Sequence, residues 1–259
     1  MKEKILMPCI PLRGLSIFPR TILHFDIGRE KSIKALEAAM NGDKLLFVSS
    51  QKDENILIPT PDDYYHVGTV VKVKQMLKIQ GDAVRVLVDG QYRATLEEIV
   101  TEEPFIQVMV EEADIIPADN TELEVQAMMR SVLYAFDEYI ELNPAVKEEV
   151  YDLISSIDDP DVFADTIAMQ MDIKISAKQE LLEAFDVKER LEILNRIILE
   201  ENQILRLERD ISEKVQESVK QNQKEYILRE QMKAIQDELG YGEEAAGEAA
   251  RWTEELEKL

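Results

Sequence analysis

The sequence predicts an α+β fold in which strands and long helices occupy different parts of the chain. Turn-forming residues are concentrated early: no glycine lies between Gly90 and Gly240, and the last proline is Pro160. Short strands need such residues at their turns, whereas long helices exclude them. Strands and helices segregated in this way are typical of the α+β class. The 259 residues correspond to two domains of ordinary size.

Seven early segments have the composition and alternation of strands, and we expect them to pair in antiparallel fashion. They are residues 4–10, 21–27, 44–50, 67–78, 83–88, 91–100 and 105–112. Asp89-Gly90 separates two of them and suits a tight hairpin turn. One short helix is predicted at 32–40, where apolar residues recur at helical spacing and Gly42 follows as a C-cap.

The later part of the chain contains signals for the start of several helices. Three have the capping-box spacing, and two place an N-cap residue before a proline at the first helical position. The capping boxes are Thr121–Glu124, Ser176–Gln179 and Asp186–Glu189, and the proline pairs are Asn143-Pro144 and Asp159-Pro160. They predict an amphipathic helix through Ile140, two helices after it, and a short helix at 177–185 before a much longer one.

The longest predicted helix runs from Val187 to Leu239, a stretch of 53 residues without glycine or proline. At about 1.5 Å per residue it would be roughly 80 Å long. Its first third is rich in apolar residues, but 212–225 contains only two, so we expect its middle to be solvated. Apolar residues return at 226–239 and predict a second contact region, and the small, acidic residues that follow predict a linker.

The net charge of −23 is uneven: it is +1 over residues 1–100, −16 over 101–170 and −8 over 171–259. No segment has the basic excess needed to bind phosphates, which argues against a nucleic-acid or membrane-surface partner. Prolines interrupt the apolar N-terminal stretch before it reaches signal-peptide length, and no window has the ~18 apolar residues of a membrane span. A single cysteine, Cys9, excludes an internal disulfide and favours a reducing, cytoplasmic location.

Patterns that carry chemistry are missing from the sequence. No glycine-rich phosphate loop is present, and His24 and His66 lack the spacing of metal ligands. Ser49-x-x-Lys52 has the spacing of a serine–lysine nucleophile but none of its companion motifs. We therefore expect no catalytic residue, cofactor site or metal site in this chain, and a role in binding or assembly.

Blocks of sequence along nearly the whole chain resemble the N-terminal region of Lon proteases. They are Ile10–Gly14, Ile17–Pro19, Ile27–Arg29, Val67–Val70, Gln75–Leu77, Arg85–Gly90, Ala164–Ala168, Lys178–Glu183, Arg190-Leu191 and Lys224–Ile235. The resemblance implies a PUA-like antiparallel β-barrel with one short helix at 1–117 and an all-α bundle at 118–186. It further implies a long helical arm at 187–240 and a linker at 241–259 toward an ATPase domain beyond Leu259.

The Lon family is one of homohexameric, ATP-dependent serine peptidases, so the resemblance implies that ATP, Mg²⁺ and the Ser-Lys peptidase site belong to domains absent from this chain. The chain would not be an enzyme by itself. It would recognise unfolded, misfolded or degron-bearing proteins and support self-association in the full-length hexamer. Two alternatives stay open: a free-standing scaffold or adaptor, and an RNA-binding PUA-like module, against which the small charge of the first 100 residues argues.

A protein that binds unfolded chains needs apolar side chains at its surface. Methionine suits this role because its flexible thioether adapts to varied partners. The candidate contacts are Ile17, Phe18 and Pro19 in the first loop, Met76 and Leu77 at a strand end, and Tyr226, Leu228 and Met232 on the distal arm. The competing interpretation is that these residues pack in a core or between helices.

Overall fold

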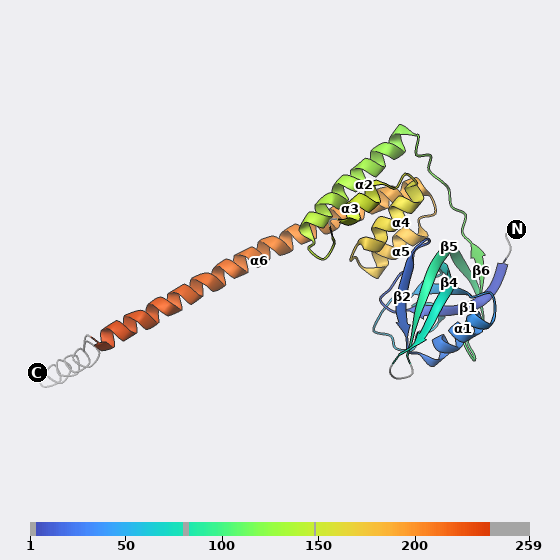
Figure 1. The fold of residues 1–259 in the computed structure, drawn as a ribbon, viewed down its shortest axis with the longest axis horizontal. Coiled ribbons are helices and arrows are strands. Elements are labelled where there is room, and N and C mark those ends of the chain that lie inside the picture. The colour runs from blue at the N-terminus through green and yellow to red at the C-terminus, as the bar shows by residue number, and fades with distance from the viewer. Residues whose placement is uncertain (1–3, 80–82, 148, 239–259) are drawn as a thin grey trace, which may run out of the picture. The chain divides into compact units, whose positions relative to one another are not determined.

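A computed structural model describes residues 4–79, 83–147 and 149–238 (Figure 1). The chain divides into two units, Met1–Gln203 and Ile204–Leu259, which are described separately below. The predicted linker at 241–259 lies outside the described residues. Among the described helices, none combines the length and the apolar character needed to cross a bilayer.

Six strands form one sheet in the first unit: β1 (Lys4–Leu12), β2 (Ile22–Ile27), β3 (Leu45–Ser50), β4 (Val67–Lys78), β5 (Val84–Thr101) and β6 (Gln107–Glu112). Their order is β2-β5-β4-β3-β1-β6, and β5 also pairs with β6. Strands β5, β4, β3, β1 and β6 therefore each have a neighbour on both sides. Every pair is antiparallel except β1 with β3, so the prediction of a wholly antiparallel sheet is wrong for this pair. A parallel pair needs a long connection between its strands, and here that connection contains β2 and the helix α1 (Glu30–Asn41).

The predicted hairpin at Asp89-Gly90 is wrong, because β5 continues through this dipeptide. The Gly90 amide donates to the Thr21 carbonyl at 2.9 Å, and the Arg20 amide donates to the Gly90 carbonyl at 2.7 Å. A Cβ at Gly90 would lie 2.3 Å from the backbone oxygen of Phe18. Glycine is needed here because two backbone segments approach each other closely. In the sequence, a glycine required for this reason cannot be distinguished from a glycine required for a turn.

In the part of the chain that the structure describes, five helices follow the sheet: α2 (Leu123–Leu142), α3 (Glu149–Ser155), α4 (Pro160–Gln170), α5 (Ile175–Glu183) and α6 (Val187–Glu238). Two predicted caps are confirmed. The Asp159 carboxylate accepts from the amides of Asp161 and Val162, with Pro160 at the first helical position. The Asp186 carboxylate accepts from the Lys188 amide at 2.8 Å, at the start of α6.

Three other predicted caps are wrong, although α2 and α5 themselves form where helices were predicted. Thr121 donates its hydroxyl to Asp119 and does not cap α2. Asn143 follows the end of α2, and its side chain accepts from the Ala145 amide in a turn, so no helix begins at Pro144. Ser176 lies inside α5, which begins one residue earlier. Short polar side chains bond to nearby backbone in turns as readily as at helix ends, and their spacing does not separate the two.

The long uninterrupted helix is confirmed over 52 residues as α6. Within the first unit its early apolar residues are buried, as Leu191, Leu194 and Ile198 show. In the second unit every residue from Arg206 to Glu238 is exposed, which confirms the expected solvation of 212–225. Residues 226–238, most of the predicted second contact region, are all exposed.

Among the described residues, the hydrophobic core of the sheet region includes two clusters of buried side chains. One lies between α1 and the sheet and includes Leu36, Leu46 and Val86. The other includes Phe47, Tyr64 and Val108. The first cluster supplies the floor of the cleft described next.

Candidate functional site

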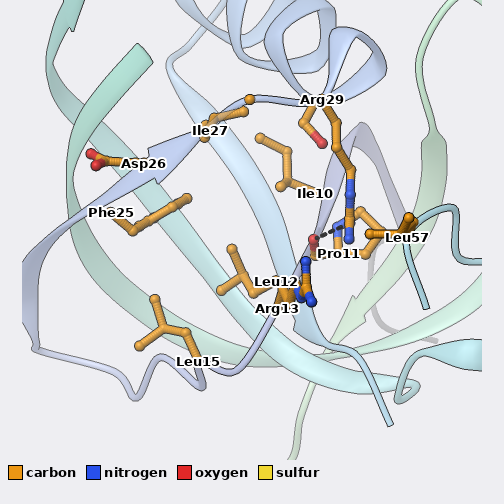
Figure 2. Close-up of a pocket in the computed structure, with 12 residues that line it drawn as sticks. Ile10, Pro11, Leu12, Arg13, Leu15, Phe25, Asp26, Ile27, Arg29 and Leu57 are labelled. Carbon is orange, nitrogen blue, oxygen red and sulfur yellow. Dashed lines mark hydrogen bonds between the residues drawn. The ribbon is translucent and has the colours of Figure 1, made fainter. Parts of the chain in front are cut away.

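An apolar cleft of about 340 Å³ opens beside the end of β1, the end of β2 and the start of α1 (Figure 2). Its floor consists of Ile10, Leu12 and Ile27, which are buried members of the first core cluster. Figure 2 shows Leu15 and Phe25 completing the wall on one side, while the exposed Leu57 lies at the rim on the other. We call this feature the arginine cleft, because two arginines also line it.

Alternation along β2 explains why one edge of the cleft is apolar. Phe25 and Ile27 face the core, whereas Asp26 between them points away from the cleft (Figure 2). The Asp26 carboxylate accepts two hydrogen bonds from Arg85, at 2.7 and 2.8 Å. These bonds from Arg85 lower the pKa of Asp26, outweighing its small desolvation. The one carboxylate that borders the cleft is therefore already neutralised by a partner.

Arg13 and Arg29 give the cleft its positive charge. Arg29 immediately precedes α1, and its guanidinium donates to the Gln51 side-chain oxygen at 2.6 Å and to the Pro11 carbonyl at 3.4 Å. Arg13 follows β1 and is exposed. Partial burial lowers the pKa of Arg29, and the nearby positive charge of Arg13 lowers it further. Neither arginine forms an ion pair with a carboxylate of the described residues.

Two adjacent cations without a counter-ion attract an anion, and a guanidinium matches the geometry of a carboxylate. The arrangement can thus hold an apolar group and a negative group side by side. The sequence interpretation did not identify Arg13, Arg29 or Leu57. A usable signal existed, because Arg13 and Arg29 belong to two separate blocks, Ile10–Gly14 and Ile27–Arg29, that resemble the Lon family and that meet at this cleft.

The first-loop candidates are not surface residues, and the prediction of their exposure is wrong. Ile17 and Phe18 are 2% and 0% exposed, and Pro19 is also buried. The Phe18 ring lies under the Arg93 guanidinium, 5.8 Å from centroid to Cζ. The Ile17 carbonyl accepts a hydrogen bond from the Thr69 hydroxyl. This loop packs inside the sheet region, so its apolar residues form core contacts.

The other five candidates divide between the two units, two in the first and three in the second. Met76 is half-buried against the first core cluster, whereas Leu77, on the opposite face of β4, is 53% exposed. Leu77 lines a shallow groove with His24, Gln75, Arg85 and Leu87. Tyr226, Leu228 and Met232 belong to the second unit and are 66%, 51% and 63% exposed. Their exposure makes these four residues available for contact.

A buried ionic network holds β5, α4 and the start of α6 together. Arg93 on β5 donates to both carboxylate oxygens of Asp165, at 2.9 and 2.5 Å, and Arg190 lies 3.3 Å from the same carboxylate. Arg93 and Arg190 also donate to the backbone oxygens of Leu182 and Ala184, at 3.2 and 2.9 Å. These interactions are intramolecular, so we assign the network a structural role.

Asp161 extends the network toward the surface, where it pairs with both Arg190 and Arg20. Burial disfavours its charged form, but the attraction of Arg190, Arg20 and Arg93 outweighs burial and lowers the pKa of Asp161. For Asp165, burial raises the pKa, and Arg93 and Arg190 oppose that shift. Among the described residues, no three His, Cys, Asp or Glu side chains gather as a metal-binding group.

Comparison with known proteins assigns a family to this architecture. A model of the ATP-dependent protease La (LON) substrate-binding domain matches residues 7–200. The chain is 47% identical over 257 residues to a Lon protease of Clostridioides difficile (strain 630), covering 98% of the chain and 32% of that protein. It is 43% identical over 258 residues to a Lon protease of Clostridium acetobutylicum, covering 99% of the chain and 33% of that protein.

This chain therefore spans about a third of the length of these curated relatives. A solved structure, the N-terminal domain of a Mycobacterium avium complex Lon protease, shares the fold with a TM-score of 0.61 at 21% identity. The match covers 75% of this chain and 98% of that one. Because the family model matches most of its length, this chain belongs to the family of Lon substrate-binding domains.

Proposed function

We propose that this chain is the substrate-recognition region of an ATP-dependent Lon protease and captures unfolded, misfolded or degron-bearing proteins. The observation that carries the proposal is the arginine cleft, an apolar opening in a domain whose family is defined by substrate binding. In this proposal, ATP, Mg²⁺ and the Ser-Lys peptidase site belong to other parts of the whole protein. The chain alone binds substrate and cleaves nothing.

We assign the parts of the chain to this function as the resemblance implies. Residues 1–117 form the PUA-like domain, and the ring of pairings from β5 through β4, β3 and β1 to β6 supports its description as a barrel. Residues 118–186 form the helical bundle, and 187–240 the arm that supports hexamer assembly. An exposed apolar stripe on the arm supports its self-association: Ile204, Leu207, Ile211, Val215 and Val219 recur every three or four residues.

Affinity for an unfolded protein follows from the burial of apolar groups that a native protein conceals. Transfer of one apolar side chain into the cleft contributes about 1.5–3 kcal/mol, before the cost of ordering the bound segment. A single cleft therefore binds weakly. Several copies of the chain in one assembly would act together through effective concentration. Leu77, Tyr226, Leu228 and Met232 are proposed as further contacts, because their side chains are exposed.

The test compares binding of the chain to one protein in two states, native and reduced-and-alkylated, by fluorescence anisotropy of the labelled ligand. The cleft variant is Leu57→Ser, and its matched control is Ile58→Ser, a neighbouring residue that is 84% exposed and does not line the cleft. We expect measurable binding of the unfolded state only, weakened by Leu57→Ser and unchanged by Ile58→Ser. Equal affinity for the two states would overturn the proposal.

A further inference from the structure

We propose that the arginine cleft recognises the C-terminal residue of a polypeptide when that residue is apolar. The α-carboxylate would pair with Arg13 and Arg29, and the side chain of the same residue would enter the apolar cleft between them and Phe25. This inference rests on the proposed function, because it specifies which part of a substrate the domain binds.

The charge at the cleft is the first argument. The chain carries a net charge of −23, yet Arg13 and Arg29 line one cleft, the positive charge of Arg13 helps to lower the pKa of the partly buried Arg29, and neither arginine has a carboxylate partner among the described residues. Asp26 and Glu30, the acidic residues nearest Arg29 in sequence, are held by Arg85 and by Lys34 at 2.7 Å. An incoming carboxylate would relieve the repulsion between the two arginines.

The hydrogen-bond capacity of the arginines is the second argument. A guanidinium has five N–H donors. Arg29 uses two of them, toward Gln51 and Pro11, and these contacts hold its side chain across the mouth of the cleft (Figure 2). Its remaining donors, and all those of Arg13, have no acceptor among the described residues. No side chain caps the first turn of α1, which adds partial positive charge beside Arg29.

The closeness of apolar and charged groups is the third argument, and it favours a chain terminus over an internal acidic residue. In an extended peptide, adjacent side chains point to opposite sides, and the next side chain on the same side as an internal Asp or Glu lies two positions, about 7 Å, away. A C-terminal residue carries the carboxylate and the side chain on one Cα. The charged Arg13 and Arg29 and the apolar Leu12 and Ile27 likewise line one cleft of about 340 Å³.

The experiment measures anisotropy of short peptides labelled at the N-terminus, with the whole chain as the binding partner. Three peptides share one sequence: one ends in leucine with a free carboxylate, one ends in leucine amide, and one ends in serine with a free carboxylate. We expect the first to bind at least about tenfold more tightly than either of the others, since charge-assisted hydrogen bonds and leucine burial each contribute on that order. A fourth peptide, a leucine amide with an internal glutamate, should bind like the plain amide.

The variants Arg13→Gln and Arg29→Gln should remove most of the difference between free acid and amide. The matched control is Arg130→Gln, an exposed arginine on α2 away from the cleft, which should preserve it. Thermal unfolding verifies that each variant is folded, and the exposed Arg13 gives the cleaner test. Equal binding of acid and amide, or full binding of the internal glutamate peptide, would overturn the inference. The proposed function would survive either result if the reduced-and-alkylated protein still binds better than its native form.

Discussion

Replacement of Asp165 by Asn tests how much the buried network contributes to the stability of the first unit. Asn keeps the size of the side chain but removes its charge and turns one acceptor into a donor that faces a guanidinium. The side chains of Arg93 and Arg190 are each 1% exposed, so they cannot regain their hydrogen bonds from water. Loss of one partner of a buried ion pair costs about 3–5 kcal/mol.

We expect a value near the lower end of that range, because Asp161 lies 3.7 Å from Arg93 and also pairs with Arg190. For a unit of about 200 residues, a loss of ~3 kcal/mol corresponds to a fall in Tm of about 6–12 °C. Urea and thermal unfolding followed by circular dichroism measure it. The control is Glu97→Gln, which breaks an exposed ion pair with Lys4 and should cost less than about 1 kcal/mol. A change within 1 kcal/mol of wild type for Asp165→Asn would refute the reasoning.

Three further predictions concern stability. Gly90→Ala places a Cβ 2.3 Å from a backbone oxygen and should lower the free energy of unfolding by at least about 1–3 kcal/mol in urea titrations; an unchanged midpoint would exclude the close approach. Phe18→Ser should lower the free energy of unfolding by about 3–5 kcal/mol, and Leu77→Ser should lower it by less than about 1 kcal/mol. Similar urea-unfolding midpoints for the two variants would contradict the burial of Phe18. The pKa of Asp161 is lowered on folding, so its contribution is present above its ordinary value of 3.8 and lost as the pH falls through the lower folded value. Asp161→Asn should therefore reduce the acid dependence of unfolding, and an unchanged dependence would argue against this role.

Local patterns predicted most of the helices and the positions of most strands. The helix at 32–40 is α1, the cap at Asp159 begins α4, and the absence of glycine and proline after Val187 predicts α6. These features depend on residues close in sequence: helical spacing, a side chain capping its own helix, and the absence of helix-breaking residues. The resemblance that identified the family also depends on linear blocks, and the family is confirmed.

The errors have a common physical origin in contacts between distant segments. The local sequence at Gly90 predicts a turn, but the reason for the glycine is a distant segment. That segment, Phe18 to Thr21, is about seventy positions away in sequence and leaves no local signal. The Ile17–Pro19 loop was predicted to be exposed because nothing near it in sequence indicates burial. The strands that bury it are remote in sequence. Burial depends on which segments come together, and a local pattern does not contain that information.

The amino-acid sequence by itself therefore determined the class of fold, most of the helices and the family of this protein, because short-range spacing and linear motifs specify them. Only the tertiary structure decided where the proposed binding surface lies. In the folded chain Phe18 is buried in the core. Arg13 and Arg29 line one cleft, and neither has a carboxylate partner among the described residues. The burial of a side chain and the net charge around a site depend on which residues are neighbours in space. Those neighbours come together only when the chain folds.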